Sequence, residues 1–162
     1  MMLFLLTLAV AQAPVDAPDD FRSIEAIMAA TYAAISGPAG PRDWDRFRAL
    51  FGEGARLIPT RCNPQGGCSA TVQSVDDYIA GSGPYFNENA FYEVEVHAVT
   101  ERYGPIAHVF STYESRRDPA GEPFVRGINT FQLRWDGRRW WVMSIMWADE
   151  RSGGPIPERY RR

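Results

Sequence analysis

Apolar residues recur at helical spacing in the first half of the chain. Between Phe21 and Ile35 they return every three or four positions, which predicts a helix with one buried face. Residues 43–51 predict a second, shorter helix, because large apolar side chains fall on one side of it. Residues 74–77, Ser-Val-Asp-Asp, resemble a capping box and are expected to start a third helix.

Short strands and a loop accompany these helices. Residues 55–60 and 70–73 are interpreted as short strands. Residues 81–90, Gly-Ser-Gly-Pro-Tyr-Phe-Asn-Glu-Asn-Ala, are interpreted as a loop, because residues typical of turns occur throughout the stretch.

The apolar spacing changes from helical to alternating after residue 90. Four strands are expected, over residues 91–103, 106–117, 124–135 and 138–147. Short turns separate them, so we expect an antiparallel meander. The fold class is therefore α+β, with a strongly curved antiparallel sheet packed on three N-terminal helices.

The stretch 127–147 holds four of the five tryptophans. A three-residue turn with Gly137 in the left-handed conformation would pair its two halves. The inner face would then contain Asn129, Phe131, Leu133, Trp141, Met143, Ile145 and Trp147. The outer face would contain Thr130, Gln132, Arg134, Trp140, Val142, Ser144 and Met146. Mixed aromatic and polar sheet faces often meet another subunit, so we expect a homodimer through the outer face.

Composition and charge indicate one folded domain. The chain has 162 residues, 45% of them hydrophobic and 13% aromatic, which is enough for a substantial core. The net charge is −3 and there is no long basic run, so no nucleic-acid partner is expected. The N-terminal apolar run is too short to span a bilayer, so no membrane span is expected.

The N-terminal residues predict export. An apolar run from Met1 is followed by two A-x-A patterns, as in a secretory signal peptide, and cleavage after Ala11 avoids placing Pro14 directly after the cut. No Lys or Arg precedes the run, so a buried N-terminal helix is the alternative. We expect a periplasmic or secreted protein with a signal peptide at 1–11, a linker at 12–20, a domain at 21–150 and a C-terminal tail at 151–162.

Cys62 and Cys68 bracket a tight loop that contains Pro64 and two glycines. In an oxidising compartment, two cysteines so close together favour a disulfide. A metal site is the alternative, but the two thiols have no His, Asp or Glu nearby in the sequence. We therefore expect a disulfide at the pocket mouth.

His97 and His108 are the only histidines, and both lie on expected strands. His97 shares one face of its expected strand with Glu93 and Glu95, and an imidazole beside carboxylates could act as a base with a raised pKa. The alternative is that both histidines make ordinary cross-strand pairs on a polar outer face. Two histidines on different strands make a metal site improbable, and no cofactor motif occurs.

A ligand pocket is expected at one end of the inner face. Tyr113 shares its strand face with small residues, which leaves room for a cavity. Asn129 lies among apolar neighbours, so its amide needs either a hydrogen bond to an adjacent loop or a ligand. The expected lining residues are Tyr113, Asn129, Trp141, Met143, Ile145 and Trp147.

Two stretches resemble a known superfamily. Residues 102–116, RYGPIAHVFSTYESR, and 127–147, GINTFQLRWDGRRWWVMSIMW, are similar to the nuclear transport factor 2-like superfamily, in particular its bacterial polyketide-cyclase-like (SnoaL-like) branch. The resemblance implies a cone-shaped fold, a pocket between sheet and helices, and dimerisation through the outer sheet face. It implies no single chemistry, because the superfold hosts many activities and non-catalytic members.

The catalytic sets of the superfamily match this sequence only in part. Ketosteroid-isomerase-like members use an Asp base with a Tyr and a protonated Asp, and here Tyr113 has no strand aspartate to act with. Epoxide-hydrolase-like members use an Asp-Arg-Asp set, and no aspartates can be placed beside Arg126. Dehydratase-like members use a His pair with tyrosines, which His97 and His108 match by residue type.

Three functions remain open from the sequence. The first is an exported protein that binds a small apolar or aromatic molecule in the pocket. The second is a cofactor-free lyase, isomerase or hydrolase with His108 or His97 as the base and Tyr113 or Asn129 as the donor. The third is a structural partner protein that uses the outer sheet face. The direction in which the two histidines point distinguishes the first two.

Overall fold

The structure is a computed structural model and describes residues 21–161. The expected signal peptide and linker lie outside these residues. The elements are α1 (Ile24–Ile35), α2 (Trp44–Arg48), β1 (Phe51–Cys62), β2 (Cys68–Ala70), α3 (Val75–Glu88), β3 (Tyr92–Tyr103), β4 (Ile106–Arg116), β5 (Val125–Trp135), β6 (Trp140–Asp149), α4 (Glu150–Gly153) and a 3-10 turn, η2 (Glu158–Tyr160).

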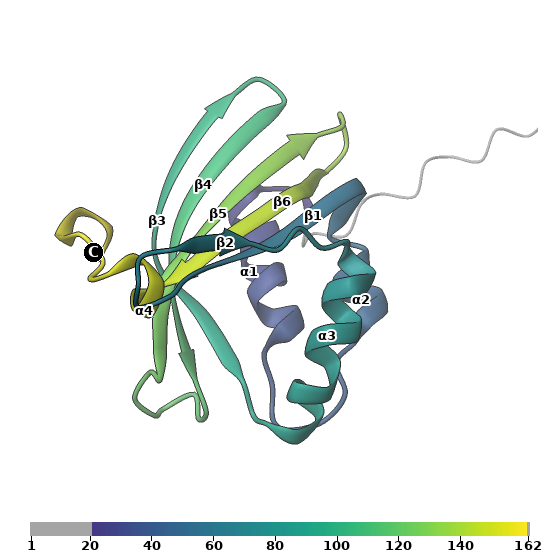
Figure 1. Ribbon diagram of the computed structural model, residues 1–162. Coiled ribbons are helices and arrows are strands. Elements are labelled where there is room, and N and C mark those ends of the chain that lie inside the picture. Colours follow the sequence, from purple (N-terminus) through teal and green to yellow (C-terminus); the bar gives the residue numbers. More distant parts are fainter. Residues whose placement is uncertain (1–20, 162) are drawn as a thin grey trace, which may run out of the picture.

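The strands form one six-stranded sheet in the order β2-β1-β6-β5-β4-β3. β1 runs parallel to β6, and the other neighbours are antiparallel. The sheet curves around α1, and α2 and α3 lie on the same side of it (Figure 1). The predicted α+β class with a curved, mainly antiparallel sheet is confirmed, although α3 follows β1 and β2 rather than preceding the sheet.

Helix α1 is the central packing element. Ser23 caps it, because its side chain accepts a hydrogen bond from the Ala26 N–H at 3.0 Å. Ile27 and Met28 are buried at 0% and 3% exposure, and Tyr32 packs edge-on against Phe131 of β5 with the ring centroids 6.1 Å apart. This packing fixes the distance between α1 and the sheet.

Helix α3 is longer than the sequence predicts. Its start is a capping box of Ser74 and Asp77, as expected. The expected loop over residues 81–90 is wrong, because the helix continues to Glu88 with Pro84 inside it. Burial of Phe86 at 3% exposure favours the helix here over the turn preferences of the local sequence.

A bulge in β6 corrects the predicted inner face. Gln132 pairs with Ser144 and Leu133 pairs with Val142, so Met143 is an extra residue between them. Beyond the bulge, Trp140 and Val142 point inward and are 2% and 0% exposed. The predicted outer positions of these two residues are therefore wrong, and a charge at Trp140 would disrupt the core rather than a subunit interface.

A second bulge, at Val96, determines which side chains of β3 face the helices. Glu95 pairs with Tyr113 and His97 pairs with Thr112, so Val96 has no partner of its own. Glu93 and Glu95 therefore face inward with the inner residues of β4. Regular alternation predicts Val94 and Val96 on the buried face of this strand, but both are 42% exposed.

The C-terminal segment lies on the side of the sheet away from α1, α2 and α3 (Figure 1). The Tyr160 ring is 4.7 Å from the Phe110 ring, and the Thr112 hydroxyl donates to the Tyr160 carbonyl at 2.6 Å. Ile156 is 5% exposed, so the segment covers part of the outer face. Among the described helices, none has the length and hydropathy needed to cross a membrane.

Candidate functional site

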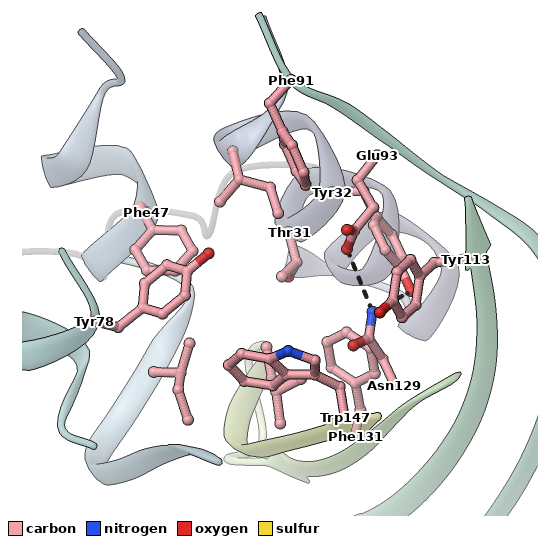
Figure 2. Close-up of a pocket in the computed structure, with 13 residues that line it drawn as sticks. Thr31, Tyr32, Phe47, Tyr78, Phe91, Glu93, Tyr113, Asn129, Phe131 and Trp147 are labelled. Atoms are coloured by element: carbon pink, nitrogen blue, oxygen red, sulfur yellow. Dashed lines mark hydrogen bonds between the residues drawn. The ribbon is translucent and has the colours of Figure 1, made fainter. Parts of the chain in front are cut away.

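A cavity of about 130 Å³, called here the inner cavity, lies between the sheet and the three helices (Figure 2). Its aromatic lining residues are Tyr32, Phe47, Tyr78, Phe91, Tyr113, Phe131 and Trp147. Its other lining residues are Thr31, Ile35, Leu57, Glu93, Asn129 and Ile145. The wall is therefore mainly aromatic, with one carboxyl group and one amide.

Glu93 on β3 is held firmly at the cavity wall. Ser36, at the end of α1, accepts from the Glu93 N–H at 2.9 Å, while its own hydroxyl donates to the Tyr32 carbonyl at 2.7 Å. Ser115 donates to Oε2 at 2.8 Å, and Asn129 donates to Oε1 at 3.4 Å. Burial raises the pKa of Glu93 to about 7, although these two side-chain hydrogen bonds act to lower it. Near neutral pH the carboxyl group therefore exists in both protonation states.

Asn129 connects Glu93 to a chain of hydroxyl groups. Its Nδ2 also donates to the Tyr32 hydroxyl at 3.1 Å, and the Tyr32 and Ser111 hydroxyls are 2.7 Å apart. Ser111 uses its one hydroxyl proton to donate to Glu95 at 2.5 Å. The proton in the hydrogen bond between Tyr32 and Ser111 must therefore come from Tyr32. Burial raises the pKa of Tyr32, so its hydroxyl stays neutral and donates to Ser111, which in turn donates to Glu95. These hydrogen bonds join side chains of α1 and the sheet rather than an adjacent loop.

Tyr113 and Trp147 also place polar atoms at the cavity. A Cβ on Gly127 would lie 2.5 Å from the Tyr113 hydroxyl and 2.5 Å from the Ala148 carbonyl, so only glycine allows the tyrosine this position. Burial raises the pKa of Tyr113, which keeps its hydroxyl protonated. The indole nitrogen of Trp147 points into the cavity (Figure 2), and its ring lies 6.2 Å from that of Tyr78.

A more open space of about 250 Å³, called here the vestibule, adjoins the inner cavity. The two spaces share Phe91, Glu93, Tyr113 and Trp147. The vestibule is more polar, because Arg61 and the ion pair between Asp149 and Arg151, at 2.5 Å, line it. A ligand can therefore be in contact with the carboxyl group of Glu93 from either space.

The predicted disulfide between Cys62 and Cys68 is present. It joins the end of β1 to β2, where the two cysteines are directly opposite each other. Arg61, the residue before Cys62, lines the vestibule. The covalent link therefore restrains one wall of the vestibule. In the described part of the chain, no three or more His, Cys, Asp or Glu side chains are grouped to hold a metal ion.

The structure brings four of the six predicted lining residues together. Tyr113, Asn129, Ile145 and Trp147 border the inner cavity. Trp141 and Met143 do not, because the bulge turns them away from it. Trp141 donates its indole N–H to Asp136 at 2.6 Å, and the Met143 sulfur lies where a side chain on Gly52 would be. The structure therefore places Trp141 and Met143 outside the lining of the inner cavity.

Both histidines lie away from the inner cavity. The Nδ1 of His108 is 2.7 Å from the Gln132 amide nitrogen, and its ring is tilted against that of Phe110 with the centroids 6.3 Å apart. His97 pairs with Thr112 on the outer side, and its Nε2 is buried without a partner among the described residues. Neither imidazole is positioned to act on a molecule in the cavity.

Glu93 is the site residue that the sequence analysis did not identify. The regular alternation of β3 placed it on a polar outer face, and the bulge at Val96 reverses that placement. One signal was present in the sequence: Ser111, Tyr113 and Ser115 alternate on the inner face of β4. The hydroxyl groups on this inner face require hydrogen-bonding partners, which a neighbouring strand can supply.

Comparison with solved structures identifies the fold. A Nostoc punctiforme protein of unknown function with a cystatin-like fold superposes with a TM-score of 0.60 at 12% identity, covering 78% of this chain and 87% of that one. A nuclear transport factor 2-like protein of unknown function from Pseudomonas putida gives 0.59 at 11% identity, covering 86% and 89%. A Parabacteroides distasonis protein named as a candidate ketosteroid isomerase gives 0.53 at 12% identity, covering 79% and 93%.

These similarities confirm the nuclear transport factor 2-like fold that the sequence predicts. No protein-family model and no curated protein sequence matches the chain. At such low identity the likeness extends to the fold and not to an activity. Membership of the polyketide-cyclase-like branch stays a prediction.

Proposed function

We propose that the protein binds a small, largely apolar molecule in the inner cavity. The observation that carries this proposal is an aromatic cavity whose wall also holds the polar groups of Glu93, Asn129 and Tyr113. Ligand sites combine mainly apolar walls with a few placed polar groups in this way. Burial opposes the ionisation of Glu93, so the carboxyl group is unfavourable in a cavity that serves only packing.

The size of the cavity limits the ligand. Its volume of about 130 Å³ is close to the roughly 150 Å³ of an engineered apolar cavity that takes up benzene. A molecule of one six-membered ring, or a branched molecule of similar size, therefore fits inside. A molecule with two fused rings would have to extend into the vestibule past Phe91 and Trp147.

Proton transfer is a second candidate function, with Glu93 rather than a histidine as the base. The observation that favours it is a buried carboxyl group with a pKa of about 7, which suits a general base near neutral pH. The Tyr113 hydroxyl borders the same cavity and stays protonated, so it could donate to a developing oxyanion. Loss of any turnover in Glu93→Gln, with binding retained, would separate catalysis from binding.

We also propose that the protein is exported and forms a homodimer through the outer face. The Cys62–Cys68 disulfide supports an oxidising compartment. Met146, on the outer face, is 43% exposed, and an apolar side chain there is suited to an interface. The proposed interface excludes Trp140 and Val142, because both side chains are buried in the core.

The binding proposal is tested by a size series. Toluene and phenol represent one ring and 1-naphthol represents two, and each is titrated by calorimetry and by thermal unfolding. We expect saturable binding of the one-ring probes, with a stabilisation of about 2.7 kcal/mol at a hundred times the dissociation constant. Ile145→Phe, which adds volume inside the cavity, should abolish binding in a folded protein. Absence of binding for all three probes would contradict the proposal.

A further inference from the structure

We propose that the inner cavity selects a small organic cation, a tertiary or quaternary ammonium ion, over neutral and anionic molecules of the same shape. This inference rests on the proposed function, because it names the class of ligand for the same cavity. Two features of the wall support it together. One is the arrangement of aromatic rings, and the other is an acidic side chain with no cationic partner among the described residues.

The aromatic rings surround the space in several orientations. The rings of Tyr78 and Trp147 are perpendicular, at an interplanar angle of 87°, and Phe47 stacks on Tyr78 at 5.5 Å. On the other side, Tyr32 and Phe131 meet at 62° with their centroids 6.1 Å apart. Ring faces carry partial negative charge and attract cations, most strongly for Trp and Tyr. An ammonium group in the cavity would lie among these rings, which line it from α1, α2, α3 and the sheet.

Glu93 adds a full negative charge to this wall when it is ionised. Its carboxylate accepts hydrogen bonds from Ser115 and Asn129, and both donors are neutral. No described residue that lines the inner cavity is Lys, Arg or His. A buried carboxylate without a counter-charge is unfavourable, and a bound ammonium ion would supply that charge.

The positive charges of the site lie in the vestibule rather than in the inner cavity. Arg61 is exposed there, and Arg151 is paired with Asp149. An anion that entered the inner cavity would face the Glu93 carboxylate and the negative ring faces. The inner wall therefore favours cations, because its lining includes the Glu93 carboxyl group and no Lys, Arg or His side chain among the described residues.

Three probes of nearly identical shape test the inference directly. Choline carries a positive charge, 3,3-dimethylbutan-1-ol replaces its nitrogen with carbon and is neutral, and 3,3-dimethylbutanoate carries a negative charge. Each is titrated into the purified protein at pH 8 by calorimetry. We expect choline to bind roughly tenfold or more tightly than the alcohol, and the alcohol more tightly than the carboxylate.

Two variants assign the preference to the named carboxyl group. Glu93→Gln keeps the shape and removes the charge, so it should bring the affinity for choline to within about threefold of that for the alcohol. Glu101→Gln, a control on the exposed part of the same strand, removes the same net charge and should change neither affinity. Thermal unfolding of both variants verifies that they are folded.

The outcomes separate this inference from the proposed function. If the alcohol binds as tightly as choline, or the carboxylate binds best, the cation inference is overturned while small-molecule binding stands. If none of the three binds and the one-ring probes also fail, the proposed function falls together with the inference. Tight choline binding that Glu93→Gln leaves unchanged would also contradict the role assigned to Glu93.

Discussion

Replacing Glu93 by Gln should stabilise the protein, and more strongly as the pH rises. Burial raises the pKa of this carboxyl group from 4.5 to about 7. A folded-state pKa above the unfolded value means that ionisation opposes folding. The destabilising effect is absent below pH 4.5, grows as the pH rises, and is complete above pH 7. Gln has the same shape and no charge, so the variant avoids the effect.

The magnitude follows from the shift of the pKa. At 1.36 kcal/mol for each pKa unit, full ionisation of Glu93 corresponds to about 3 kcal/mol of stability. About 2–3 kcal/mol of this should develop between pH 5 and pH 8. For a protein of this size the melting temperature of the variant should then rise by roughly 5–10 °C relative to the wild type over that interval.

Neighbouring groups leave this expectation intact. Tyr32, Tyr78 and Tyr113 each interact with Glu93, but their raised pKa values keep all three neutral between pH 5 and pH 8. Subtracting the wild-type stability removes the contributions of other groups that titrate in both proteins.

The assay is urea or thermal unfolding of wild type, Glu93→Gln and Glu101→Gln at pH 5, 6, 7 and 8 without reductant. The Glu101 control is exposed and should follow the wild type at every pH. A difference between Glu93→Gln and the wild type that is constant from pH 5 to pH 8 would refute the reasoning. It would mean that the carboxyl group of Glu93 ionises in the cavity as it does in water.

Three further predictions concern the fold and the assembly. Gly127→Ala should cost roughly 1–3 kcal/mol, because its Cβ meets the Tyr113 hydroxyl and a backbone carbonyl, whereas Gly81→Ala in open space should not destabilise; chemical unfolding compares them. Cys62→Ala with Cys68→Ala should lower stability by about 2 kcal/mol, and alkylation of native wild type should find no free thiol. Met146→Glu should convert a homodimer to a monomer in light scattering, and a wild type already monomeric at micromolar concentration would disprove the dimer.

The positions of the helices and strands follow from sequence periodicity where packing and local preference agree. The helix over 24–35 and the four C-terminal strands show this agreement. The helix across residues 81–88 does not, because Pro84 and the glycines favour a turn locally. Burial of Phe86 against its aromatic neighbours outweighs that preference, and such long-range contacts have no local sequence pattern.

The inner site could be predicted only as far as the strand register was regular. Asn129 and Trp147 are paired on the C-terminal side of the bulge in β6 at Met143. The regular alternation therefore places both correctly on one face. Residues 140–142, on the N-terminal side of this bulge, lie on the opposite face from the one predicted, and so do the residues of β3 that precede Val96. Both bulge residues are apolar and suit a strand, so neither carries a local signal for the irregularity.

Binding in the inner cavity is tested most directly by the indole N–H signals of the five tryptophans in a heteronuclear NMR spectrum. Trp147 is the only tryptophan among the described residues that line the cavity, and its indole nitrogen points into it (Figure 2). With Trp147→Phe used to assign the signal, we predict that a one-ring probe shifts the Trp147 resonance saturably and leaves the Trp141 resonance unchanged. An unchanged Trp147 signal at millimolar probe, or a shift of Trp141 instead, would contradict binding in this cavity.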